Sequence, residues 1–157
     1  MKILCIDPGE TTGFAVLEDH RANLHQAMTR NVHDMMEELN KFYDLDLVIY
    51  ENYLIYPNKV RMHTMKELVI PKLCGAIEAF CSIKDVDFIT YRATDTHTGL
   101  DNMVHALNNG TKMKHEWRHA SDALLLGLRY YLDCGTILEN LKNIQICLCK
   151  QKLFEDD

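Results

Sequence analysis

The chain has 157 residues, the length of one globular domain, and residues 1–157 are predicted to form a single domain. With 47% apolar and 25% charged residues the composition excludes a disordered chain, and no apolar run approaches the ~20 residues of a membrane span. The net charge of −6 argues against nucleic-acid binding by the whole surface, so any contact with a polyanion has to be local.

The N-terminus and the cysteines indicate the cellular compartment. Residues 1–3 lead into a strand rather than a signal peptide, so we expect a soluble, cytoplasmic protein. The 6 cysteines are scattered, mostly within apolar segments, and are interpreted as buried thiols rather than disulfide partners. Cys147 and Cys149 lack the second cysteine pair that a zinc site normally has.

The first predicted elements are a buried strand over residues 3–6, a turn rich in Gly, Pro and Thr, and a second strand. Asp7 stands where the first strand leaves the core, and a buried carboxylate is costly unless it is paired. One interpretation is that Asp7 accepts hydrogen bonds from the amides of the turn. The other is that it binds a metal or belongs to a phosphate-binding turn.

Residues 23–43 predict a third strand over 23–30 and then a helix over 31–43 with Asn31 as its N-cap. Residues 45–50 form a second run typical of a buried strand, and this strand also ends in an acid, Glu51. An aromatic and basic loop over residues 52–61 follows.

The second half of the chain contains further helices and one more strand. Apolar residues recur at helical spacing over 62–80, with a kink or two abutting helices expected at Pro71. The remaining predicted elements are a strand over 86–91, a weaker helix over 94–108, a helix over 115–132 and a peripheral tail over 136–157 that keeps one apolar run at 144–148.

The two strand-end acids become informative together with the last helix, which carries His119 and Asp122 one turn apart. If the first and fourth strands are neighbours, Asp7 and Glu51 emerge side by side, and the helix can bring His119 and Asp122 to the same point. Clustered carboxylates repel one another, and a pair of divalent cations about 4 Å apart removes that conflict. Alternatively, Glu51 is a solvated strand end, Asp122 a first-turn residue and His119 a surface histidine.

Three motifs resemble the RuvC-like Holliday junction resolvases of the ribonuclease H-like superfamily, and they span most of the chain. They are Ile6-Asp7-Pro-Gly-x-Thr-Thr-Gly-Phe-Ala15, Val48-Ile-Tyr-Glu51 before an aromatic loop, and His119-Ala-Ser-Asp122-Ala-Leu. The resemblance implies an α/β fold with a mixed five-stranded sheet flanked by helices. It also implies that Asp7, Glu51, His119 and Asp122 are catalytic residues that ligate two Mg²⁺ or Mn²⁺ ions. Many bacterial members have Asp at the position of His119, which leaves the metal preference open.

By this resemblance the chain is a metal-dependent endonuclease that cleaves four-way or related branched DNA by phosphodiester hydrolysis, with a role in recombination and repair. A homodimer is expected, because two cuts on opposed strands need two sites related by a two-fold axis. The stripe Met62, Met65, Leu68 and Val69 is interpreted either as the dimer surface or as intramolecular core. Small relatives of this kind are often encoded by phages.

Local DNA contacts are predicted from basic and aromatic residues beside the site. Tyr53 or Tyr56 is expected to stack on an unpaired base at a branch point. The basic residues expected to contact the phosphate backbone are Lys59, Arg61, Lys66, Lys112, Lys114 and Arg118.

Two other functions remain open from the sequence. A nucleotide-binding protein of the actin and Hsp70 kind also begins with such a hairpin, but it needs two of these domains and this chain has the length of one. A catalytically silent adaptor for branched DNA is the other alternative, although carboxylates that face phosphates do not help a protein that only binds DNA.

Overall fold

The computed structural model describes residues 1–53, 69–92, 100, 115–135 and 144–148. Its centre is a six-stranded sheet with the strand order β5-β4-β1-β2-β3-β6. The strands are β1 (Ile3–Asp7), β2 (Thr11–Glu18), β3 (Arg21–Met28), β4 (Leu47–Glu51), β5 (Asp87–Tyr91) and β6 (Gln145–Leu148). The α/β mixed sheet expected from the sequence is therefore confirmed.

The first strand lies at the centre of this sheet because it pairs on both sides. It runs antiparallel to β2, with Ile3 opposite Leu17 and Asp7 opposite Gly13, and parallel to β4, with Ile6 opposite Tyr50. The expected neighbourhood of the first and fourth strands is thus confirmed. Parallel neighbours end at the same edge of a sheet, so β1 and β4 bring their C-terminal acids to one place.

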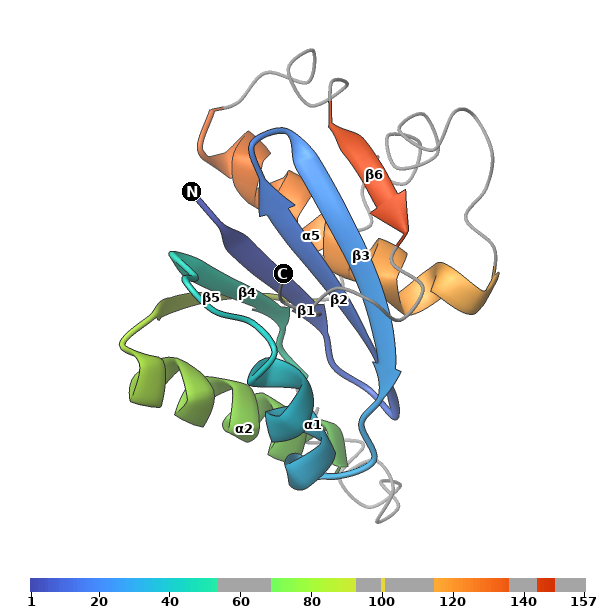
Figure 1. Cartoon of the computed structure of the whole chain (residues 1–157), viewed down its shortest axis with the longest axis vertical. Coiled ribbons are helices and arrows are strands. Elements are labelled where there is room, and N and C mark those ends of the chain that lie inside the picture. The colour runs from blue at the N-terminus through green and yellow to red at the C-terminus, as the bar shows by residue number, and fades with distance from the viewer. Residues whose placement is uncertain (54–68, 93–99, 101–114, 136–143, 149–157) are drawn as a thin grey trace, which may run out of the picture.

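Helices cover both faces of the sheet, as Figure 1 shows. Helix α5 (Arg118–Asp133) follows a short 3₁₀ turn, η2 (His115–Trp117), and packs on one face. Helices α1 (Val32–Leu39) and α2 (Val69–Lys84) lie together on the other. Alternate residues of the strands supply the two cores: Ile3 and Cys5 face α5, whereas Leu4 and Ile6 face α1 and α2.

The first helix begins as expected but is shorter. Asn31 caps it by accepting a hydrogen bond from the amide of Asp34, at 3.0 Å. The helix ends at Leu39 rather than near residue 43, yet Phe42 still reaches the core, where it is 3% exposed. The predicted helix was too long because the loop after it also buries an apolar side chain, which extends the helical spacing of apolar residues in the sequence.

The sheet has one strand more than the five expected. The apolar run at residues 144–148 was assigned to a peripheral tail, but Gln145–Leu148 forms β6 and pairs in parallel with β3, Ala22 lying opposite Ile146. Pairing of this kind uses backbone groups of an edge strand, and a run of four residues is too short for its periodicity to predict a strand.

The interpretation of all cysteines as buried thiols is wrong for two of them. Cys5, Cys74 and Cys81 are buried and unbridged, whereas Cys134 and Cys147 are exposed. Cys134 follows the last residue of α5 and Cys147 lies on the edge strand β6, positions that leave one side open to solvent. Cys149 lies outside the described residues.

Several predicted segments fall in the undescribed parts of the chain. These are most of the loop over 52–61, the first part of the helix over 62–80, and the helix over 94–108 apart from the buried Leu100. Pro71 is the third residue of the described α2, which continues from there to Lys84. Of the dimer stripe only Val69 is described, and it packs partly buried against the α1–α2 core. No helix in the described ranges is long and apolar enough to cross a membrane.

Helix α1 is tied to β3 by a partly buried ion pair, which gives the fold a pH-dependent contact. Nε2 of His25 lies 3.0 Å from Oε2 of Glu38, and Nζ of Lys41 lies 2.7 Å from Oε1. The hydrogen bond with His25 is the main reason why the pKa of Glu38 is below its ordinary value of 4.5. A lowered folded-state pKa stabilises the protein above the unfolded value, and that stabilisation is lost as pH falls through the folded value.

We therefore predict that Glu38→Gln lowers the free energy of unfolding by about 1 kcal/mol at pH 7. The difference from the wild-type chain should shrink as the pH falls below 4.5, because the wild-type carboxylate is then protonated as well. Urea denaturation from pH 3 to 8 measures this. Glu37→Gln, which removes an exposed carboxylate of the same helix, is the control. A destabilisation that does not depend on pH would contradict the prediction.

Candidate metal centre

The site lies where β1 and β4 end, on the face of the sheet that α5 covers. Asp7 is the last residue of β1 and Glu51 the last of β4. Side chains alternate along a strand, so Asp7 shares its face with Ile3 and Cys5 of the α5 core, and Glu51 shares its face with Ile49. The register that sets Ile6 opposite Tyr50 brings the two acids to neighbouring positions.

Helix α5 supplies a partner for the first of these acids. Nδ1 of His119 lies 2.7 Å from Oδ2 of Asp7, and the Asp7 side chain is only 15% exposed against 40% for His119. The hydrogen bond to Asp7 raises the pKa of His119 above its ordinary value of 6.5, and burial acts in the opposite direction with less effect. The Asp7 carboxylate is therefore held by a cationic or hydrogen-bonded partner rather than left alone at the strand end.

Asp122 completes a group of three candidate ligands. Asp7, His119 and Asp122 each offer an oxygen or nitrogen atom, and these atoms lie within 4.8 Å of one another. Two carboxylates and one imidazole fit a divalent cation: oxygen ligands suit Mg²⁺ and Mn²⁺, and imidazole is compatible with Mn²⁺. The residues of this site therefore fit the ion that the resemblance implies, with Glu51 as a third acid beside the group.

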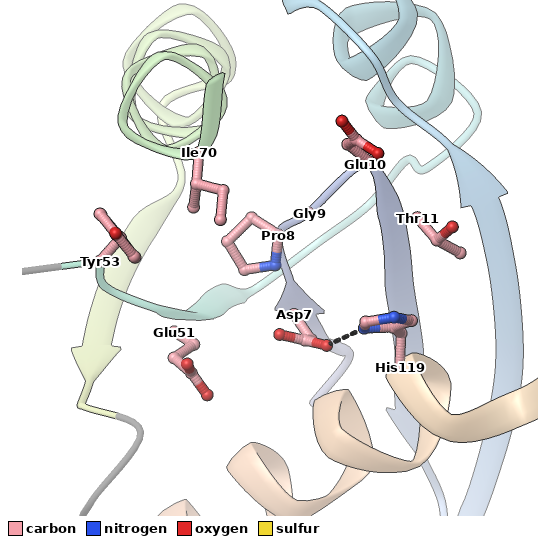
Figure 2. A pocket seen from close by; sticks show the side chains of 9 residues that line it. All are labelled: Asp7, Pro8, Gly9, Glu10, Thr11, Glu51, Tyr53, Ile70 and His119. Carbon is pink, nitrogen blue, oxygen red and sulfur yellow. Dashed lines mark hydrogen bonds and ion pairs between the residues drawn. The ribbon is translucent and has the colours of Figure 1, made fainter. Parts of the chain in front are cut away.

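A pocket opens over this group. It is lined by Asp7, Glu51 and His119, by the turn over Pro8–Thr11, and on its far side by Tyr53 and Ile70. Figure 2 shows Asp7 between Glu51 and His119, with Tyr53 and Ile70 on the side opposite His119. All four residues predicted as ligands thus belong to one region. Three of them form the close group, and Glu51 shares the pocket with Asp7 and His119. Their roles as ligands stay a prediction.

Two buried threonines hold the turn that follows Asp7. Thr12 and Thr29 are both 0% exposed, and each hydroxyl donates to the carbonyl oxygen of Gly9, at 3.0 and 2.8 Å. Their hydroxyl oxygens also contact each other, and the amide of Thr29 donates to the carbonyl of Glu10 at 3.0 Å. Thr29, the residue after β3, therefore helps to fix the turn that follows Asp7. Thr12 belonged to the first motif, but nothing in the sequence identified Thr29.

We predict that Thr29→Val, which keeps the shape but removes the hydroxyl, lowers the free energy of unfolding by about 1–3 kcal/mol. The Gly9 carbonyl loses one of its two hydroxyl donors, and the Thr12 hydroxyl loses its contact with the Thr29 hydroxyl. Chemical denaturation measures the change. Thr90→Val on the exposed part of β5 is the matched control, because the same substitution there removes no buried hydrogen bond partner. Equal effects of the two substitutions would contradict this account.

Only two of the residues predicted to contact DNA are described. Tyr53 lines the pocket, and Arg118 is the exposed first residue of α5, next to His119. The other six, Tyr56, Lys59, Arg61, Lys66, Lys112 and Lys114, lie outside the described residues. Sequence reasoning missed Glu10, Thr11 and Ile70 as lining residues. For Ile70 no signal was present, since it lies at an ordinary apolar position of a helix.

Comparison with known proteins gives structural matches only. The sequence matches no family model and no curated protein. RuvC of Thermus thermophilus in complex with a Holliday junction substrate is 21% identical, with a TM-score of 0.62 over 87% of this chain and 97% of that one. A second structure of Thermus thermophilus RuvC is also 21% identical, with a TM-score of 0.60 over 87% of this chain and 98% of that one. The Fowlpox virus resolvase in complex with Holliday junction DNA is 14% identical, with a TM-score of 0.53 over 83% of this chain and 99% of that one.

These similarities extend over nearly the whole length of the solved proteins and over most of this chain. At identities of 21% and 14% they establish the fold and leave the activity to the chemistry of the site. In this chain β1 lies between β2 and β4, and the acids that the sequence motifs singled out stand at the ends of β1 and β4. The chain thus has the fold of the solved RuvC and Fowlpox virus resolvase structures.

Proposed function

We propose that this chain is a metal-dependent endonuclease that hydrolyses phosphodiester bonds in four-way junctions or related branched DNA. The observation that carries the proposal is the group of Asp7, His119 and Asp122, whose ligand atoms lie within 4.8 Å of one another at the C-terminal edge of β1. Glu51 is a fourth candidate ligand, and it shares the pocket with Asp7 and His119. The fold supports the substrate class, because solved proteins of this fold are resolvases in complex with Holliday junctions.

The residues of the site would hold up to two Mg²⁺ or Mn²⁺ ions, with Asp7 placed between His119 and Glu51. Bound divalent ions at such a site activate water and stabilise the charge that develops on the phosphate oxygens. The chain itself fixes the ligands. The hydrogen bond between His119 and Asp7 sets the orientation of both side chains, and the threonine-held turn keeps Asp7 at the strand end.

Tyr53 and Arg118 are proposed to contact the DNA around this centre. Tyr53 stands on the pocket wall opposite His119, where an aromatic ring is placed to stack on a base beside the scissile phosphate. Arg118 is exposed at the start of α5 and offers a cation to the backbone, which the net charge of −6 makes necessary at this place. The six undescribed basic and aromatic residues are proposed to extend this contact.

The active form is proposed to be a homodimer. A single site cuts one strand, whereas resolution of a junction needs two cuts on opposed strands, and a two-fold axis supplies two equivalent sites. Sedimentation of the chain alone and of its complex with a four-way junction tests this part of the proposal independently of cleavage.

One panel of DNA substrates tests the activity. A four-way junction, a flap, a duplex, a single strand and an RNA–DNA hybrid are each incubated with Mg²⁺ or Mn²⁺, with an excess of chelator as the control. We expect cleavage of the junction or the flap with either ion, and none with the chelator. Selective binding of the junction without any cleavage would favour the adaptor. Cleavage of duplex and junction at the same rate would contradict the structure-selective part of the proposal.

A further inference from the structure

The first turn of α5 carries His119, with Asp122 one turn further on, but it has no side-chain cap of its own. Trp117 occupies the N-cap position and makes no capping hydrogen bond. The first amides of a helix have no partner within the helix, so an uncapped first turn is free to fray unless something else holds it. A turn that frays cannot keep His119 in place over Asp7.

The sheet holds this turn through a residue of β3. The backbone amide of Ala120, the residue after His119, donates to Oε1 of Gln26 at 3.4 Å, the long end of the hydrogen bond range. Gln26 is a residue of the strand and stands far from α5 in the sequence, so this bond joins two separate elements. It provides the acceptor that the N-cap residue does not.

The backbone of α5 also touches β2 directly, at Gly13. A Cβ atom at Gly13 would lie 1.9 Å from the carbonyl oxygen of His119 and 2.4 Å from the amide nitrogen of Ala120. Both are backbone atoms, so no rotation of a side chain relieves the clash. Any residue other than glycine at position 13 has to push the first turn of α5 away from the sheet.

These contacts form one row across the sheet. Asp7 pairs with Gly13, and Gly13 pairs with Gln26, so the three residues occupy directly opposed positions on β1, β2 and β3 and face the same side. All three meet residues His119 and Ala120: Asp7 through the imidazole, Gly13 through the backbone and Gln26 through the Ala120 amide.

We propose that Gly13 and Gln26 are positioning residues for the metal centre, which fix the height of the first turn of α5 above Asp7 and so set the ligand geometry. The part of the proposal that concerns the metal ion rests on the proposed function. The part that concerns the position of His119 does not depend on it. Gly13 lets the helix approach the sheet closely, and Gln26 holds the turn at that distance.

The same helix offers a matched control for Gly13. At Gly127 an added Cβ would lie 2.1 Å from Cδ1 of Leu17 and 2.8 Å from Sγ of Cys5, both ends of side chains. Gly127 is two turns further along α5 and contacts none of the proposed ligands. Gly13→Ala and Gly127→Ala thus both crowd the interface between α5 and the sheet, but only the first does so at the metal centre.

The experiment compares these variants in two measurements. Mn²⁺ affinity is measured by titration calorimetry, and the imidazole signal of His119, assigned with His119→Gln, is followed by NMR without metal. We expect Gly13→Ala to weaken Mn²⁺ binding by about tenfold or more and to shift the His119 signal. Gly127→Ala should lower the melting temperature and leave both measurements unchanged. Wild-type affinity and an unshifted signal in Gly13→Ala would overturn the proposal.

Substitution of Gln26 keeps the proposal testable if Gly13→Ala does not fold. Gln26→Met has a similar length but no oxygen acceptor, whereas Gln26→Glu retains one. We expect the Ala120 amide to exchange its hydrogen faster in Gln26→Met than in the wild-type chain, and to be protected again in Gln26→Glu. The His119 signal should shift in Gln26→Met, but less than in Gly13→Ala. Unchanged exchange in Gln26→Met would overturn the role of Gln26. If the wild-type chain binds no Mn²⁺, the metal centre is refuted. The His119 signal then still shows whether Gly13 and Gln26 position His119.

Discussion

Replacing Asp7 by Asn is expected to reduce junction cleavage by at least about 100-fold while junction binding is retained. Residues that only orient metal ligands change affinity or activity by about 10- to 100-fold when they are removed, and the loss of a ligand should cost at least as much. The substitution preserves the size of the side chain and removes its charge. It also weakens the partner of His119, whose Nδ1 lies 2.7 Å from Oδ2 of Asp7.

The measurement is single-turnover cleavage of a labelled four-way junction, together with a binding assay on the same DNA in the presence of Ca²⁺. Asp19→Asn is the matched control, because Asp19 is exposed in the turn between β2 and β3, where its φ of 46° suits Asn equally well. Wild-type cleavage by Asp7→Asn would remove Asp7 from the metal centre and with it the proposed mechanism.

Much of this centre was predictable because it depends on local sequence. An unbroken apolar run before Asp7 and another before Glu51 indicate two strands buried on both faces, and both strands were found. The spacing of His119 and Asp122 places them one turn apart on any helix. These pieces meet only on the condition that the first and fourth strands are neighbours, which the strands themselves do not decide and which the pairing of β1 with β4 fulfils.

The contacts that hold the centre in place were not predictable in the same way. Gly13 appeared in the sequence only as a residue of a turn motif, although its function here is to let the backbone of His119 approach β2. Gln26 and Thr29 look like ordinary polar residues near the end of a strand. Their partners lie 94 and 20 residues away in the sequence, so no periodicity or local spacing reveals them.

Substitution of His119 is expected to change the preference of the site between Mn²⁺ and Mg²⁺. We expect His119→Ala to weaken Mn²⁺ binding by about tenfold or more, because one of the three grouped residues proposed as ligands is lost. His119→Asp should retain cleavage and shift its balance from Mn²⁺ towards Mg²⁺, since a carboxylate is a harder ligand than an imidazole. The same substitution places a third carboxylate beside Asp7 and Asp122, so repulsion should lower the stability of the metal-free protein.

Cleavage rates across a titration of each metal, with melting temperatures measured with and without Mg²⁺, test both parts. Mg²⁺ should raise the melting temperature of His119→Asp more than that of the wild-type chain, because the ion relieves the added repulsion as it binds. His33→Ala is the control, since His33 is 79% exposed on α1 and pairs only with Glu37 among the described ion pairs. If His119→Ala cleaves the junction at the wild-type rate with an unchanged metal profile, His119 serves only to orient Asp7, and the ion is held by the carboxylates of Asp7, Glu51 and Asp122.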